Sequence, residues 1–220
     1  MKVCLGGTFS ILHAGHEALL RKAFETGSDV TIGLTTDGMA ERMGKRVETY
    51  GERQQKLRRF LSDKFGRDAT IVPLDDPYGP AVEGDFDAIV VSPETVEGAE
   101  RINDERRKRG LGELEVVKVP FVLADDGIPV SSSRIRRGEI ENDTRVIPLN
   151  IRIASSDGEK ISKTREAFEK LLPGMDVRFG SERADYTVEF KSGKCTVRDI
   201  TGYTTEGENV EEALLARLNH

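Results

Sequence analysis

Residues 6–16 read Gly-Gly-Thr-Phe-Ser-Ile-Leu-His-Ala-Gly-His. They follow an apolar run at residues 2–5 that predicts a strand, and they lead into a helical pattern at residues 15–26. Gly6 and Gly7 allow a turn whose backbone approaches a ligand closely, and the start of the helix presents unpaired N–H groups to an anion. This strand-to-helix junction therefore predicts a phosphate site.

The two histidines of the junction are the candidates for chemistry there. His13 and His16 are three residues apart, so both rings project toward the same place on the first turn of a helix, and Gly15 leaves room between them. Such imidazoles can donate hydrogen bonds to phosphate oxygens that gain charge during a transfer reaction. Two alternatives are a pair of structural histidines and a metal pair. The metal pair is disfavoured because the remaining histidine is His220 and no carboxylate cluster completes a coordination shell.

Outward from the junction, strand-like runs alternate with helical patterns. We expect strands at 2–5, 29–34, 69–74, 87–91 and 114–119, and helices at 15–26, 52–64 and 96–109. The runs rich in valine and isoleucine predict strands covered on both faces, as in a parallel sheet wrapped by helices. The fold class is thus α/β, a Rossmann-like doubly wound sheet whose ligand lies beyond the carboxyl ends of the strands.

The pattern changes after Val146. A strand at 150–154 and a helix at 159–172 lead through strands at 175–179, 184–190 and 195–200 to a closing helix at 210–218. Residues 191–194 read as the turn of a hairpin. We therefore expect a main domain over residues 1–147 and a small C-terminal α+β domain of unknown role over residues 148–220.

Composition excludes several classes of function. The chain has 220 residues, of which 37% are hydrophobic and 33% charged, and no apolar run approaches the roughly 20 residues of a membrane span. The N-terminus lacks the apolar run of a signal peptide, so we expect a cytoplasmic protein with no membrane partner. The net charge is -6, and the basic run 106–109 shares its helix with acidic residues, so no nucleic acid partner is expected. Cys4 and Cys195 are expected to be buried thiols.

The Gly-Gly-Thr-Phe and His-x-Gly-His motifs of residues 6–16 resemble the signature of the nucleotidyltransferase superfamily that includes cytidylyltransferases and adenylyltransferases. Ser10 departs from this pattern, since many members carry an acidic residue there. Three later segments also resemble the archaeal and eukaryotic type of phosphopantetheine adenylyltransferase. They are Asp-Asp-Pro-Tyr-Gly-Pro at 75–80, Val-Ser-Pro-Glu-Thr at 91–95 and Val-Ser-Ser-Ser-Arg-Ile-Arg at 130–136. The resemblance covers about residues 1–146.

This resemblance implies transfer of the adenylyl group of ATP to 4'-phosphopantetheine, with Mg²⁺ held by the ATP phosphates and no protein ligand to the metal. The catalytic residues that it implies are Thr8, His13, His16 and Lys45. The nucleotide would contact Gly6, Gly7, Thr8, Phe9, His13, His16, Ser131, Ser132, Ser133 and Arg134. The acceptor would contact Lys45, Arg53, Asp76 and Tyr78.

Several alternatives stay open. Another member of the superfamily would use nicotinamide mononucleotide, or a phosphoalcohol with CTP, and a protein of another class would bind a nucleotide without turnover. Residues 131–133 can be read as an ordinary helix cap, and Lys45 and Arg53 as surface cations. Residues 150–172 are distantly similar to the opening strand and helix of inosine/xanthosine triphosphate pyrophosphatases. Because seventy-odd residues are too few for that enzyme, a relic or a structural appendage is expected.

Overall fold

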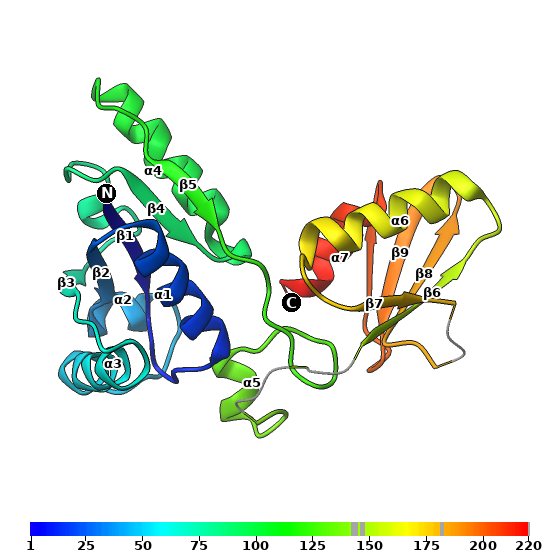
Figure 1. Ribbon diagram of the computed structural model, residues 1–220, viewed down its shortest axis with the longest axis horizontal. Coiled ribbons are helices and arrows are strands. Elements are labelled where there is room, and N and C mark those ends of the chain that lie inside the picture. Colours follow the sequence, from blue (N-terminus) through cyan, green and yellow to red (C-terminus); the bar gives the residue numbers. More distant parts are fainter. Residues whose placement is uncertain (142–144, 146–147, 181–182, 220) are drawn as a thin grey trace. The chain divides into compact units, whose positions relative to one another are not determined.

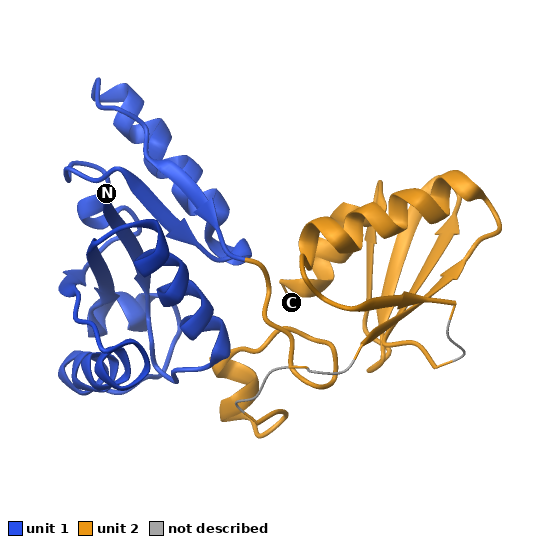
Figure 2. Ribbon diagram, viewed as in Figure 1, with its two compact units in different colours: residues 1–119 blue, residues 120–220 orange. Residues whose placement is uncertain are grey.

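The computed structural model describes residues 1–141, 145, 148–180 and 183–219 (Figure 1). Its contacts divide the chain into two compact units, Met1–Val119 and Pro120–His220 (Figure 2). The predicted boundary at residue 147 lies outside the described residues. The observed division comes earlier in the chain, and it assigns the segment that follows Val119 to the second unit.

The first unit, in which every residue is described, is built on a five-stranded parallel sheet in the order β3-β2-β1-β4-β5. The strands are β1 (Lys2–Gly7), β2 (Asp29–Thr35), β3 (Thr70–Leu74), β4 (Ala88–Val91) and β5 (Glu115–Lys118). Successive strands run outward from β1 on one side and then resume with β4 on its other side, so the strand order reverses at β1. The doubly wound fold is therefore confirmed, and its ligand-binding crevice is expected at the carboxyl end of β1.

Helices cover both faces of this sheet. They are α1 (Ala14–Thr26), α2 (Asp37–Arg42), α3 (Tyr50–Phe65) and α4 (Val96–Lys108), with short 3₁₀ helices η1 (Gly79–Ala81) and η2 (Pro93–Thr95). Alternate residues of a strand point to opposite faces. Thus Val3 and Leu5 of β1 pack in the core with residues of α1 and α3, whereas Cys4 packs with residues of α4. This two-sided burial explains the apolar character of the strands.

Helix α3 shows how local sequence sets the bounds of an element. Thr49 and Glu52 form a capping box at its start, and Gly66 ends it in the left-handed conformation, with φ of 60°. Leu57 and Leu61 lie one turn apart on its buried face.

The second unit contains a mixed sheet whose described strands follow the order β10-β9-β8-β6-β7. Its elements are β6 (Leu149–Ala154), β7 (Val177–Phe179), β8 (Tyr186–Lys191), β9 (Lys194–Asp199), β10 (Thr204–Gly207), α5 (Ser132–Arg136), α6 (Gly158–Leu171) and α7 (Val210–Leu218). β6 pairs in parallel with β7 and β8, and β9 joins β8 and β10 in antiparallel fashion. The predicted α+β architecture is confirmed.

The turn between β8 and β9 is the predicted hairpin. Lys191 pairs with Lys194, and both central residues have positive φ, 51° at Ser192 and 81° at Gly193. Positive φ at both central positions is typical of the turn that matches the twist of a two-residue hairpin.

The segment between the two sheets packs against the sheet of the second unit. Phe121 and Leu123 are buried in the same core as the residues of β6, β8 and β9. The hydroxyl of Tyr186 donates a hydrogen bond to the carbonyl of Gly127 at 2.7 Å, and Arg145 pairs with Asp185 at 2.7 Å. These contacts are the reason why the division between the units precedes the predicted boundary.

Two further expectations concern burial and membranes. Cys4 and Cys195 are both buried free thiols, as predicted. None of the helices in the described parts of the chain has the length and apolar character that a membrane span requires.

Candidate functional site

The loop after β1 is held in an unusual backbone conformation. Phe9 has a φ of 49°, in the left-handed region that non-glycine residues rarely occupy, and its side chain is buried. Its ring lies 4.9 Å from the ring of His16. A Cβ at Gly7 would lie 2.8 Å from Cε2 of Phe9, so Gly7 is required because the aromatic ring occupies the space of its side chain. The glycine that the sequence analysis assigned to close approach of a ligand thus also accommodates Phe9.

The histidine pair lies at the start of α1, as the spacing predicted. His13 is the N-cap residue of the helix, and His16 lies on its first turn. The centroids of the two rings are 3.9 Å apart, with an angle of 36° between the ring planes. In both residues Nδ1 is buried and has no hydrogen-bond partner among the described residues. Because buried polar atoms are normally paired, these two nitrogens mark a place where a ligand can complete the hydrogen bonding.

Both histidines are uncharged at neutral pH. Burial lowers the pKa of His13 to about 4. It also lowers the pKa of His16 to about 3, with smaller contributions from His13 and from the positive charge of Lys45. A neutral imidazole offers one N–H donor and one acceptor nitrogen. The pair can therefore donate hydrogen bonds to an anion without acting as strong acids.

Lys45 reaches the same place from the connection between α2 and α3. Its ammonium group donates a hydrogen bond to Oγ1 of Thr8 at 3.3 Å, and its backbone N–H donates to the carbonyl of Ala40 at 2.9 Å. The structure therefore brings together Thr8, His13, His16 and Lys45. A mobile cation beside the hydroxyl and the imidazoles is suited to bind phosphate oxygens.

Glu94 interacts electrostatically with Lys45, and the sequence analysis assigned it no role. It lies in η2, directly after β4, the strand beside β1. Burial raises the pKa of its carboxyl group, and the charge of Lys45 opposes this shift. Its position at the carboxyl end of a neighbouring strand was the signal that could have identified it.

Arg53 was predicted to contact the acceptor, and the structure assigns its side chain differently. The side chain is 0% exposed. Its nitrogens donate to the carbonyls of Glu48 and Thr8 at 2.8 and 3.0 Å, and to Asp37 at 2.9 Å. Because the guanidinium is enclosed by protein oxygens, it is not available to a bound molecule in this structure. The sequence of α3 could have indicated this burial, because Arg53 precedes the buried Leu57 by one turn and so lies on the same face of the helix.

Asp76 and Tyr78 lie after β3, which is separated from β1 by β2. Oδ1 of Asp76 accepts hydrogen bonds from the backbone N–H groups of Tyr78 and Gly79, both at 2.8 Å, so this carboxylate shapes the loop. The Tyr78 side chain is exposed. A contact of either residue with substrate stays a prediction.

The serine segment belongs to the second unit. Ser131 is the N-cap of α5, and its hydroxyl accepts a hydrogen bond from the N–H of Arg134 at 3.3 Å, which agrees with the alternative of an ordinary helix cap. Arg134 pairs with Asp126 and also donates to the carbonyl of Pro129 at 3.0 Å. Contact of residues 131–134 with the nucleotide therefore stays a prediction.

No acidic or histidine cluster in the described part of the chain has the composition of a metal site.

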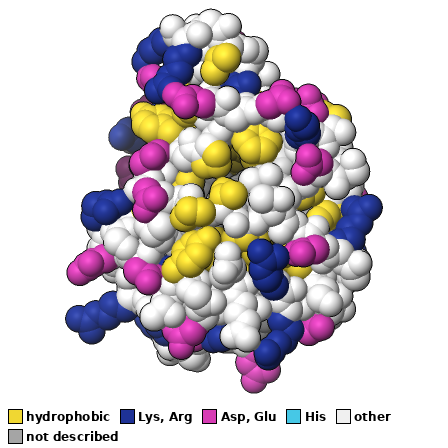
Figure 3. Space-filling model, turned by 90° about the vertical axis from the view of Figure 1, so that its left-hand side faces the viewer, with side chains coloured by type: hydrophobic (Ala, Val, Ile, Leu, Met, Phe, Trp, Pro, Cys, Tyr) yellow, Lys and Arg dark blue, Asp and Glu magenta, His cyan; other side chains and the backbone are white. Residues whose placement is uncertain are grey.

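On the face of the molecule shown in Figure 3, basic and acidic side chains are interspersed, and hydrophobic side chains gather near the centre of the face. This face thus lacks the one-sided positive charge that nucleic acid binding requires.

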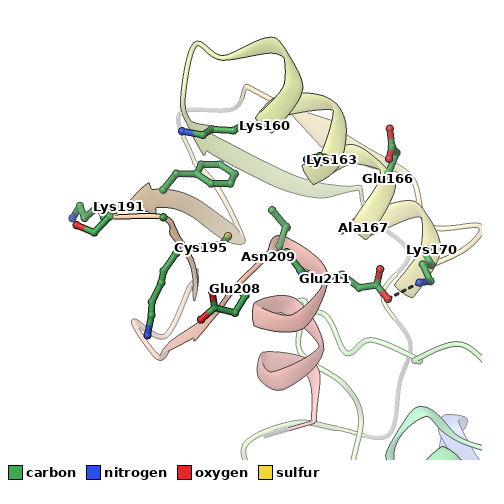
Figure 4. Close-up of a pocket in the computed structure, with 15 residues that line it drawn as sticks. Lys160, Lys163, Glu166, Ala167, Lys170, Lys191, Cys195, Glu208, Asn209 and Glu211 are labelled. Atoms are coloured by element: carbon green, nitrogen blue, oxygen red, sulfur yellow. Dashed lines mark hydrogen bonds and ion pairs between the residues drawn. The ribbon is translucent and has the colours of Figure 1, made fainter.

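The second unit has a hollow of its own, of about 600 Å³, between α6, the β8–β9 hairpin and the start of α7 (Figure 4). The charged residues that line it are Lys160, Lys163, Glu166, Lys170, Lys191, Lys194, Glu208 and Glu211. Some of these charges are balanced locally, since Lys170 pairs with Glu211 at 2.5 Å, and Lys163 with the neighbouring Glu159 at 2.7 Å. The sequence analysis did not predict this hollow.

Comparison with known proteins identifies the family. Residues 4–138 match the family model described as cytidylyltransferase-like. The chain belongs to the cytidylyltransferase-like family. A phosphopantetheine adenylyltransferase of Methanopyrus kandleri is 51% identical over 143 residues, which are 64% of this chain and 90% of that protein. A crystal structure of a protein with unknown function from Archaeoglobus fulgidus is 42% identical and covers 54% of this chain and 89% of that chain, with a TM-score of 0.52.

One relative of this cytidylyltransferase-like chain matches more of the chain than the family model does. It is named bifunctional phosphopantetheine adenylyltransferase/NTP phosphatase, from Thermoplasma volcanium, and is 41% identical over 192 residues. These residues are 86% of this chain and 57% of that protein, so the chain spans little more than half of the relative. Because 192 residues are more than the stretch 4–138 holds, the similarity continues beyond the part that the family model matches. The predicted resemblance to phosphopantetheine adenylyltransferases is confirmed.

Proposed function

We propose that this chain is a phosphopantetheine adenylyltransferase, which transfers the adenylyl group of ATP to 4'-phosphopantetheine and yields dephospho-coenzyme A and pyrophosphate. One observation carries the proposal. Two neutral imidazoles with unpartnered nitrogens lie at the reversal point of the sheet, in a chain whose relatives bear this name. A family member that binds phosphates needs such donors where the ligand enters.

The chemistry requires no protein nucleophile. An oxygen of the acceptor phosphate attacks the α-phosphorus of ATP, the bond to the bridging oxygen breaks, and its electron pair leaves with pyrophosphate. The acceptor is already an anion, so no strong base is needed. Catalysis then consists of holding the two reactants in line and stabilising charge on the α-phosphate, and such orientation lowers a barrier by about 7–11 kcal/mol.

Each residue of the cluster has a role in this proposal. His16 donates a hydrogen bond to an α-phosphate oxygen, and His13 supports the triphosphate. Thr8 orients the phosphates with the backbone of Phe9, and Lys45 bridges the donor and acceptor phosphates. ATP enters as its magnesium complex, whose metal is held by phosphates and water. Residues 131–134 would hold the remaining phosphates. ATP and the acceptor are small cytoplasmic metabolites, so we infer that the enzyme acts in the cytoplasm without a nucleic acid or membrane partner.

The experiment is an assay of the purified chain with ATP, Mg²⁺ and 4'-phosphopantetheine, in which dephospho-coenzyme A is detected by mass spectrometry. Parallel reactions replace the acceptor by nicotinamide mononucleotide, or ATP and the acceptor by CTP and a phosphoalcohol. Formation of dephospho-coenzyme A alone supports the proposal, and a product only in another reaction assigns a different acceptor. ATP binding without pyrophosphate release in any reaction would show a module without turnover.

The same assay without acceptor addresses the second unit. Because the Thermoplasma volcanium relative also carries the name NTP phosphatase, nucleoside triphosphates are incubated alone and hydrolysis is measured. Hydrolysis that survives substitution of His16 would arise outside the adenylyl transfer site.

A further inference from the structure

The buried side chain of Arg53 connects several separate parts of the site. Nε donates to the carbonyl of Glu48 at 2.8 Å, and Nη1 donates to the carbonyl of Thr8 at 3.0 Å and to Oγ1 of Thr35 at 3.3 Å. Nη2 forms an ion pair with Asp37 at 2.9 Å. One guanidinium thus contacts the loop after β1, the end of β2, the start of α2 and the residue just before the cap of α3.

These contacts bracket the segment that carries Lys45. The segment from Asp37 to Glu48 comprises α2 and most of the connection to α3, and both of these end residues bind Arg53. Lys45 lies between them and donates to the hydroxyl of Thr8, whose carbonyl also binds Arg53. The relative position of Lys45 and Thr8 therefore depends on Arg53 at both ends of the segment and at Thr8 itself.

We propose that Arg53 is a positioning residue. It holds Thr8 and Lys45 in the relative position that binding of the donor and acceptor phosphates requires. The inference rests on the proposed function, and it replaces the predicted direct contact between Arg53 and substrate. A lysine cannot take over this task, because only the planar guanidinium presents donors in several fixed directions.

The chain offers a matched control in Arg106 of α4. Arg106 is buried as well, and it donates to the carbonyls of Gly112, Ala81 and Gly84 at 2.6, 2.8 and 3.0 Å. None of these partners belongs to the cluster of Thr8, His13, His16 and Lys45. Replacement of Arg106 by lysine therefore reports the cost of losing a buried guanidinium in the same unit, without a change at the site.

The experiment is a double-mutant cycle of R53K with K45A, with R106K and its K45A combination as controls. We expect R53K to lower kcat about 30-fold, with a much smaller change in KM, because small misplacements of reacting groups have large effects on rate. In the K45A background R53K should lower kcat by no more than about 3-fold, since Lys45 is absent and Arg53 then affects only the placement of Thr8. R106K should lower the melting temperature to a similar degree as R53K does. It should leave kcat within about 2-fold of its parent, both in the wild-type and in the K45A background. Equal effects of R53K with and without Lys45, or an equal loss in R106K, would overturn the inference.

A second variant and a second measurement keep the proposal testable. If R53K does not fold, D37N removes the charged partner of Arg53 at a half-exposed side chain, and the same loss of effect in the K45A background is expected. If the wild-type protein makes no dephospho-coenzyme A, the proposed function fails, and the cycle is measured as ATP affinity by calorimetry. Coupling between Arg53 and Lys45 in ATP affinity would support the positioning role, and additive effects would refute it.

Discussion

At the scale of single residues, the site depends on two imidazoles that are kept uncharged. His13 and His16 lie at the partly buried start of α1, and burial lowers the pKa of both far below neutrality. Their rings are in contact, with centroids 3.9 Å apart, so two positive charges would repel each other there. The site therefore offers N–H donors to phosphate without a positive charge on either ring.

Substitution of His16 by alanine should lower kcat about 100-fold or more, because it removes a donor aimed at charge that develops in the transition state. The free energy of unfolding should fall only by the packing of the ring against Phe9 and His13, since Nδ1 of His16 has no hydrogen-bond partner among the described residues. Steady-state kinetics and urea unfolding measure the two quantities. A loss of kcat below about 3-fold would remove His16 from the catalytic role.

The depressed pKa values also predict a dependence of stability on pH. Histidines of the unfolded chain bind protons below their ordinary pKa of 6.5, whereas His13 and His16 of the folded chain do so only near 4 and 3. The free energy of unfolding should therefore decrease as the pH falls from about 6.5 toward about 4. The double variant H13N/H16N should show a smaller decrease between about pH 7 and about pH 5 in urea unfolding. An unchanged pH dependence would contradict the assigned pKa values.

The sequence predicted the histidine pair because its geometry is local, set by three residues of helix. It did not predict the burial of Arg53, because that depends on the face by which α3 packs against the sheet. Asp76 shows a similar limit, since its carboxylate serves the backbone of its own loop, an interaction that an acidic residue after any strand can make.

At the scale of elements, the predicted strands and helices of the first unit lie within two residues of the observed ones. The short elements α2 and β10 are among those that were not predicted. β10 reads Thr-Thr-Glu-Gly and has no apolar alternation, so it is a strand only because it pairs with β9. α2 has six residues and is specified mainly by its cap, since Thr36 accepts a hydrogen bond from the N–H of Met39. Elements of this length depend on tertiary partners that a periodic pattern does not show.

Helix α3 yields a test at this scale. The Thr49 hydroxyl accepts a hydrogen bond from the N–H of Glu52, and the Glu52 carboxylate accepts one from the backbone N–H of Thr49. T49A should lower the free energy of unfolding by about 1 kcal/mol because one end of this reciprocal pair is lost. T49S keeps the hydroxyl and should stay close to wild type in the same urea titration. Equal stability of T49A and T49S would show that the cap has no role in stability.

At the scale of the whole molecule, the division into units does not follow the predicted domain boundary. The relative from Methanopyrus kandleri aligns over 143 residues, which are 90% of its own length. The first compact unit ends earlier, at Val119, and excludes residues 131–134. The periodicity of the sequence located the second sheet, but it could not show that the chain before this sheet packs with it.

Two truncated chains test how much of the sequence the reaction and ATP binding require. A chain of residues 1–147 should keep kcat within about 3-fold of the full chain, since it retains every residue assigned to the reaction. Its melting temperature and solubility should fall, because Phe121 and Leu123 lose the core that covers them. A chain of residues 1–119 should lose affinity for ATP if residues 131–134 bind phosphate. Full ATP affinity in the shorter chain would remove that segment from the nucleotide site.

The fit of Phe9 against Gly7 has an evolutionary consequence. Any side chain at position 7 would collide with the ring of Phe9, and Phe9 itself is held at a φ that most residues avoid. Position 7 cannot change alone, so a descendant that gains a side chain at the glycine must first have a smaller residue at position 9. The ring also touches His16, so each intermediate along that path would disturb the imidazole before the new pair is complete.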